Sequence, residues 1–220
     1  DFGMSFNVAN QYFAEFLQPR KCTALVDFFE LGLLPDIKGI YREDYLKHMN
    51  HPAEARSVDA VLLTHAHADH AQYIHFLRTD IPIYCTEATR TILRAVEETG
   101  SNPLSDLITA CDAFTVYTNK KGNLSRVTRR NAEFVHERFY HVLEPEDKVK
   151  IGSLEVEMVP VDHSLPGACG YIIHSEEGNL VYTGDIRFHG SNQALSKNFV
   201  EKAKAAHPKW LISEGTRIDS

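Results

Sequence analysis

A run of metal-ligand residues directly after an apolar segment constrains this chain more than any other feature. Residues 58–64 are almost continuously apolar, as expected of a strand that is covered on both faces. The next six residues read His-Ala-His-Ala-Asp-His. In an extended backbone, residues i and i+2 lie on the same side, so His65 and His67 can direct two imidazoles at one metal ion. Asp69 and His70, where we expect a helix to begin, can face a second ion.

The residue types in this run indicate which kind of site it forms. Imidazole and carboxylate ligands suit zinc and similar divalent ions, and the absence of thiolates from the run argues against a purely structural zinc site. Surface histidines would be scattered along the chain, whereas four ligand-type residues occupy six positions here. We therefore expect a metal site, with zinc preferred and manganese or iron as alternatives.

Composition favours a globular domain in a reducing compartment. The 220 residues are 43% hydrophobic and 24% charged, enough to form a sizeable core, and no stretch reaches the roughly 20 apolar residues of a membrane helix. We expect a soluble, cytoplasmic protein. The cysteines are far apart and form no Cys-x-x-Cys pair, so we expect reduced thiols with small, buried, apolar roles. They are Cys22, Cys85, Cys111 and Cys169.

The net charge of −7 argues against binding nucleic acid through overall charge, because phosphates need a basic surface. A local basic segment remains possible and is the one candidate for phosphate contacts. It contains Lys120, Lys121, Arg126, Arg129 and Arg130. The alternative is a solvated loop and helix face.

Local patterns predict helices and strands in both halves of the chain. We expect helices around Val8–Phe16, over Ala24–Leu31, over Glu87–Glu98 with Thr86 as its N-cap, and over Thr128–Arg138. We expect strands over Val58–Thr64, Leu154–Val161, Tyr171–His174, Leu180–Thr183 and Lys209–Ser213. Helices flanking two sets of strands indicate a layered α/β sandwich in a single unit of residues 1–220.

The order of the motifs resembles that of the metallo-β-lactamase superfamily. The run at 65–70 is similar to its His-x-His-x-Asp-His signature. Val161-Asp162-His163-Ser164 resembles the motif with an isolated third His, Tyr182-Thr183-Gly184-Asp185 the strand-ending Asp motif, and Asp1-Phe2-Gly3 the first Asp-containing turn. The resemblance implies an αββα sandwich, present here as its first half and the start of the second.

The resemblance also implies a set of site residues. His65, His67 and His163 would bind one metal, Asp69 and His70 the other, and Asp185 would bridge the two. Asp69 would in addition act as the general base, with Asp185 as the second catalytic carboxylate, and Asp1 would orient the histidines. The family closes the second metal site with a further His. His189 and His207 are interpreted as surface residues, so this ligand is expected beyond Ser220, in a longer chain.

The sequences of the later motifs resemble those of one branch of the superfamily, the β-CASP nucleases, which include ribonuclease J and the cleavage and polyadenylation endonucleases. The residues are Asp162–Ala168, Gly184–Gly190 and Trp210–Thr216. Glu214 would then be an extra acidic motif beside the metals, although an exposed strand-end Glu is the alternative. The resemblance implies hydrolysis of RNA, or of DNA, by two divalent ions, and an inserted domain after residue 220.

Three other functions remain open. A thioesterase or lactonase of the same superfamily would need its complete ligand set within a chain of about this length. A diiron oxygen- or nitric-oxide-reducing protein usually carries an acidic residue at the position of His67. A non-catalytic scaffold or RNA-binding homologue would typically have lost metal ligands, whereas this chain retains every one that it is long enough to contain.

Overall fold

The computed structural model describes residues 1–4, 24–100, 102 and 104–215. The helix predicted around Val8–Phe16 and the cysteine at position 22 lie outside these residues.

The first half of the chain forms a helical layer on a small parallel sheet. Its helices are α2 (Ala24–Glu30), α3 (Glu43–His48), α4 (Ala68–Ala71) with the 3₁₀ turn η1 (Gln72–Phe76), and α5 (Glu87–Thr99). Its sheet has the order β1-β2-β7, with β1 (Val61–Leu62), β2 (Ile83–Cys85) and β7 (Tyr140–Val142) all parallel. Apolar side chains of α2, α3 and η1 form the largest core, packed against this sheet.

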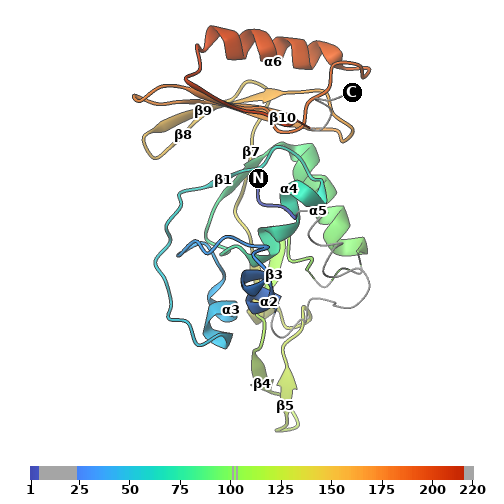
Figure 1. Cartoon of the computed structure of the whole chain (residues 1–220). Coiled ribbons are helices and arrows are strands. Elements are labelled where there is room, and N and C mark those ends of the chain that lie inside the picture. The colour runs from blue at the N-terminus through green and yellow to red at the C-terminus, as the bar shows by residue number, and fades with distance from the viewer. Residues whose placement is uncertain (5–23, 101, 103, 216–220) are drawn as a thin grey trace.

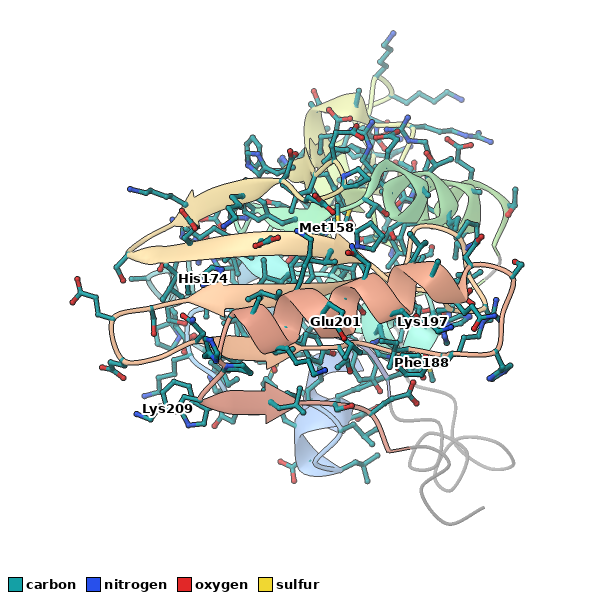
Figure 2. All side chains as sticks on the ribbon, turned by 90° about the horizontal axis from the view of Figure 1, so that it is seen from above. Met158, His174, Phe188, Lys197, Glu201 and Lys209 are labelled. Atoms are coloured by element: carbon teal, nitrogen blue, oxygen red, sulfur yellow. The ribbon has the colours of Figure 1, made fainter. Side chains whose placement is uncertain are left out.

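The second half forms a larger sheet with one helix on its outer face. The sheet order is β12-β11-β10-β9-β8, with β8 (Lys148–Ile151), β9 (Leu154–Pro160), β10 (Cys169–His174), β11 (Leu180–Tyr182) and β12 (Trp210–Ile212). Neighbouring strands are antiparallel except for the parallel pair β11 and β12. Helix α6 (Gln193–Ala205) lies across this sheet (Figure 2).

The two sheets pack face to face, so the layers are helices, sheet, sheet and helix (Figure 1). Tyr171 of β10 is fully buried between them, and its hydroxyl lies 2.9 Å from the Leu63 carbonyl and 3.0 Å from the Tyr84 carbonyl. On the outer face, Phe199 of α6 packs over Gly170, where a Cβ would lie 2.5 Å from the ring. The predicted αββα sandwich is confirmed.

The helix predicted over Thr128–Arg138 is wrong. The structure has a 3₁₀ turn, η2 (Ala132–Phe134), followed by the strand β6 (Val135–Glu137), which pairs with β3 (Thr109–Cys111). The Asn131 side-chain oxygen accepts hydrogen bonds from the Thr128 backbone nitrogen and hydroxyl, and such local bonds compete with helix formation. The β-branched Val135 then favours a strand.

The basic segment forms neither a plain loop nor a helix. Its first part is a hairpin of β4 (Val116–Thr118) and β5 (Leu124–Arg126). Figure 1 shows this hairpin projecting from the end of the molecule opposite α6.

The other predicted elements agree closely with the structure. The helices α2 and α5 begin and end within one residue of the predicted bounds, and the four strands predicted after residue 150 are all present. The strand predicted over Val58–Thr64 is assigned only at Val61–Leu62, although Leu63 continues its hydrogen bonding to Tyr84. Cys85 and Cys169 are buried free thiols, as expected, and burial raises the pKa of each to about 12. No helix within the described ranges has the length and apolar character needed to span a membrane.

Candidate metal centre

The first two histidines leave the sheet together at the end of β1. His65 is completely buried and His67 is the residue before helix α4. His67 keeps an extended backbone at this point, with φ −63° and ψ 150°. His65 Nε2 and His67 Nδ1 consequently lie 2.9 Å apart, with their rings nearly perpendicular.

Two later segments bring a third histidine and a carboxylate to the same place. His163 follows β9, and its Nε2 lies 3.1 Å from His67 Nδ1. Asp185 follows β11, and its Oδ2 lies 3.4 Å from His163 Nε2 and 3.8 Å from His65 Nε2. The four donor atoms lie within 4.8 Å of one another.

A second group of donors shares Asp185. Its other oxygen, Oδ1, lies 3.1 Å from His70 Nε2. Asp69 Oδ2 lies 3.9 Å from the same His70 nitrogen, and the three donors again lie within 4.8 Å of one another. Each oxygen of Asp185 therefore faces a different group.

The spacing of the donors fits divalent ions. Bonds of about 2.0–2.1 Å in a tetrahedral arrangement separate two ligand atoms by roughly 3.3 Å. The distances in the first group, from 2.9 to 3.8 Å, bracket that value. The donors are imidazole and carboxylate only, which is typical of reactive rather than structural zinc sites. The residues thus fit a pair of metal ions.

Asp1 lies behind the histidines and fixes their orientation. Its carboxylate accepts hydrogen bonds from the Thr64 nitrogen at 2.7 Å, from the Thr64 hydroxyl at 2.8 Å and from the Tyr182 hydroxyl. Asp1 Oδ2 also lies 2.7 Å from His70 Nδ1. His65 Nδ1 lies 3.0 Å from the Thr64 hydroxyl, which already donates to Asp1 and can therefore accept. Both imidazoles then hold their proton on Nδ1 and leave the Nε2 lone pair facing the site.

Two glycines allow the segments to approach this closely. Gly3 packs on the Asp69–His70 peptide, where a Cβ would lie 2.0 Å from the Asp69 carbonyl. Gly184 has a φ of +55°, and a Cβ there would lie 2.7 Å from the Thr64 side chain. Any larger residue at either position would separate Asp1 or Asp185 from the histidines.

Burial favours the neutral form of His65 and His163, which metal binding requires. The pKa of His65 is lowered to about 2, mainly by burial and in addition by the nearby His70, His163 and His67. Burial also lowers the pKa of His163, against the opposing effect of the Asp185 carboxylate. Their lone pairs are thus available at neutral pH.

The contacts between Asp162 and Arg187, which we call the clamp, join the segments that carry His163 and Asp185 and were not predicted from the sequence. Asp162 is buried and accepts hydrogen bonds from the Arg187 guanidinium at 3.0 and 3.2 Å, while the Arg187 backbone nitrogen donates to the Asp162 carbonyl at 2.9 Å. These contacts tie His163 to the loop that carries Asp185. Both clamp residues belong to the motifs quoted above, but nothing in a one-dimensional pattern indicates that they pair.

The structure also places the remaining predicted residues. Glu214 accepts a hydrogen bond at 2.7 Å from the Ile186 nitrogen, one residue after Asp185, so it supports the loop that carries the shared carboxylate. His189 and His207 are exposed, in agreement with their interpretation as surface residues. Asp69 is the most exposed donor, at 38%.

The αββα fold and the two linked donor groups together define a class of protein, the metal-dependent hydrolases of the metallo-β-lactamase type. A family model described as a beta-lactamase superfamily domain matches residues 34–199. The chain therefore belongs to the beta-lactamase superfamily.

Several relatives within the superfamily are ribonucleases. The chain is 27% identical over 194 residues to ribonuclease J of Thermus thermophilus, covering 82% of this chain and 27% of the relative. It is 24% identical over 204 residues to ribonuclease J of Pyrococcus abyssi, covering 87% of this chain and 34% of the relative. These matches confirm the resemblance to ribonuclease J and its β-CASP relatives. The chain spans only 27% and 34% of the length of these two relatives.

A solved structure has the same fold. It is a protein of unknown function from Enterococcus faecalis V583, with 28% sequence identity and a TM-score of 0.71. The match covers 100% of this chain and 44% of that one.

Proposed function

We propose that the chain carries the metal-binding core of a dinuclear hydrolase that cleaves RNA phosphodiester bonds. In this proposal His65, His67 and His163 bind one divalent ion, Asp69 and His70 bind the other, and Asp185 bridges them. Zinc is the preferred metal, and a cytoplasmic location is part of the same proposal.

The position of Asp185 is the observation on which the proposal depends. Its Oδ2 faces His65 and His163, and its Oδ1 faces His70 at 3.1 Å. A carboxylate that presents one oxygen to each of two donor groups is the geometry needed to bridge two ions. A purely structural zinc site would instead surround one ion with four ligands.

The donor groups suggest how the residues would share the chemistry. Two bound ions would supply a water of lowered pKa and would neutralise the charge on the attacking and leaving oxygens of a phosphodiester. Asp69, the most exposed of the donors, would accept the proton of that water and pass it to solvent. Asp1 would hold His70 and, through Thr64, His65 in the tautomer that faces the ions.

The choice of RNA rests on the relatives, which are named as ribonucleases. DNA is the alternative nucleic acid. A thioester or lactone would be the substrate if the protein is a small-molecule hydrolase of the same superfamily, because the fold alone does not select the substrate.

The test combines metal content with hydrolysis. The intact wild-type protein should contain about two divalent ions per chain by elemental analysis and should cleave an end-labelled RNA. Asp185→Asn and His67→Ala should remove this cleavage and leave the far-ultraviolet circular dichroism spectrum unchanged. His189→Ala is the matched control, because His189 lies in the same loop as Asp185 but is exposed.

The outcomes separate the alternatives. Hydrolysis of a thioester or lactone without cleavage of RNA would replace the nuclease by a small-molecule hydrolase. Fewer than one ion per chain, with no hydrolysis, would favour a scaffold. Full activity in Asp185→Asn would remove this residue from the site.

A further inference from the structure

A large cavity in the described part of the chain lies outside the candidate metal centre. It has a volume of about 770 Å³ and lies between α3, the segment after β3 and the segment after β5. Tyr45, Phe114 and Val127 form an apolar wall, and Arg126, Arg129 and Arg130 line the cavity as well. None of the metal-donor residues lines it.

The charge of the surrounding segment differs from that of the rest of the protein. Residues 113–131, which we call the basic lobe, contain five lysines and arginines and no acidic residue, in a chain whose net charge is −7. Arg129 pairs with Glu97 at 3.0 Å and with Asp106, so it has a structural role. Within the described residues, the other four cations of the lobe form no ion pair.

An aromatic residue of the lobe is held at the cavity in a strained conformation. Phe114 has a φ of +57°, which is rare for a bulky residue and which marks functional sites more often than other positions. Phe114 as a residue is 36% exposed, and its ring stacks on His48 at 3.8 Å with an interplanar angle of 8° and meets Tyr45 edge-on. A flat aromatic pair at the surface is a platform on which another ring can stack.

We propose that the basic lobe is a second binding site for single-stranded RNA, in which the cavity takes one nucleotide. The base would pack against Phe114, and Arg126 and Arg130 would bind the adjoining phosphates, since guanidinium groups pair well with phosphate oxygens. Lys120 and Lys121, at the hairpin turn, extend the positive charge beyond the cavity, which favours a polymer over a free nucleotide. Aromatic stacking combined with backbone cations is the usual mode of single-strand binding. The choice of RNA over DNA rests on the proposed function.

Binding can be measured separately from cleavage. The protein with Asp185→Asn is titrated into a fluorescein-labelled 12-nucleotide oligouridylate, and fluorescence anisotropy is followed at several salt concentrations. Adding Arg126→Gln and Arg130→Gln should raise the Kd at least about tenfold. It should also reduce the slope of log K against log salt by about 1.4, because each phosphate contact on a single strand contributes about 0.7.

A matched control removes the same number of positive charges from another part of the surface. Lys197→Gln with Lys204→Gln removes two exposed cations from α6, at the opposite end of the molecule (Figure 1), and should leave the Kd and the salt slope unchanged. Phe114→Asn, which suits the left-handed backbone, should weaken binding without changing the slope. An unchanged circular dichroism spectrum would show that each variant is folded.

Several results would overturn the proposal. If the α6 variant weakened RNA binding as much as the lobe variant does, the effect would come from overall charge and not from a site. If uridine monophosphate bound as tightly as the oligomer, the ligand would be a free nucleotide. Competition by polyglutamate as strong as that by RNA would make the partner an acidic protein. Cleavage of RNA by the wild type without binding at the lobe would overturn only this site, whereas binding at the lobe without cleavage would overturn only the nuclease.

Discussion

At the scale of single residues, one carboxylate supports both groups of metal donors. Asp1 lies 2.7 Å from His70 Nδ1 and accepts a hydrogen bond from the Thr64 hydroxyl, which lies 3.0 Å from His65 Nδ1. Residues that hold a metal-binding imidazole in place raise its basicity and fix its orientation. In the proposed dinuclear site, Asp1 would therefore influence both ions without binding either.

Asp1→Asn should weaken metal binding by about 10- to 100-fold and leave the fold intact. The amide keeps one acceptor but lacks the charge that favours the Nδ1–H tautomer of His70. Competition with a chromogenic chelator measures the affinity. Asp59→Asn, an exposed carboxylate just before β1, is the control and should have no effect, whereas an unchanged affinity in Asp1→Asn would contradict the orienting role.

A second buried histidine, outside the metal centre, makes stability depend on pH. His75 is buried, its Nδ1 accepts a hydrogen bond from the Asp106 nitrogen at 3.1 Å, and its Nε2 lies 2.8 Å from the Tyr45 hydroxyl. Both contacts suit a neutral ring with its proton on Nε2. Burial lowers its pKa from 6.5 to about 3, with a smaller contribution from the Arg42 charge and against the opposing effect of Asp106.

The lowered pKa of His75 should destabilise the fold in mild acid. Between pH 6.5 and 3 the unfolded chain holds more protons on this group than the folded chain does, so the free energy of unfolding falls as the pH falls. From pH 6.5 to 5 the loss is about 2 kcal/mol. Urea unfolding at pH 7 and pH 5, in EDTA, should show a loss that is smaller by about this amount in His75→Gln, whose amide can keep both hydrogen bonds, than in the wild type. The lowered pKa values of His65 and His163 contribute the same further loss to both proteins. Equal pH dependence in the two proteins would contradict the assignment.

At the scale of elements, the start of α5 is joined to the loop that carries His163. The Thr86 hydroxyl accepts a hydrogen bond from the Thr89 nitrogen at 3.2 Å and donates to the Gly167 carbonyl at 2.8 Å. Gly167 has a φ of +80°, and a Cβ there would lie 2.6 Å from the Thr86 hydroxyl oxygen. The N-cap of one helix therefore also supports a loop from the other half of the sandwich.

Thr86→Ala should lower the free energy of unfolding by about 1 kcal/mol. The substitution leaves the Thr89 nitrogen without its cap and removes the shorter of the two hydroxyl hydrogen bonds to the Gly167 carbonyl. Chemical denaturation measures the change, and Thr86→Ser, which keeps the hydroxyl, should retain most of the stability. A loss of the same size in Thr86→Ser would point to the missing methyl group rather than to the hydrogen bonds.

The elements also differ in how far the sequence predicts them. Helix α5 was predicted correctly because its cap and its terminal Gly100 are local signals. Residues 128–138 were predicted as a helix, but their structure depends on pairing with Thr109–Cys111, which no local pattern reveals. Helix α6 was not predicted, because its buried face is small and centres on Ser196 and Phe199.

The candidate site was easier to predict than the helices around it. Each donor lies in a short motif directly after an apolar strand, as His65 and Asp185 do, so the local sequence carries most of the information. The clamp between Asp162 and Arg187 was not predictable, because it is a contact between two loops. The ligand roles themselves stay predictions until metal is measured.

At the scale of the whole molecule, the candidate metal centre lies at the interface between the two halves of the sandwich. One half contributes His65, His67, Asp69 and His70, and the other contributes His163 and Asp185. A ligand that binds only the folded protein stabilises it by an amount that grows with the logarithm of its free concentration relative to its Kd. Metal bound at this interface would therefore oppose separation of the two sheets as well as local opening of the site.

Removal of metal should consequently lower the stability of the entire domain. With free metal at about 1,000 times its Kd, binding adds about 4 kcal/mol to the free energy of unfolding. EDTA should remove this stabilisation, and the domain should still unfold in a single cooperative transition. His163→Ala withdraws one ligand of the second half, so most of the metal-dependent gain should disappear, while His189→Ala should keep it. The comparison is made by guanidinium unfolding of the three proteins with and without zinc. A zinc-dependent gain that survives in His163→Ala would mean that the ion binds one half alone. The two sheets would then be held together without the ion, by their packed apolar faces and by hydrogen bonds such as those from the Tyr171 hydroxyl.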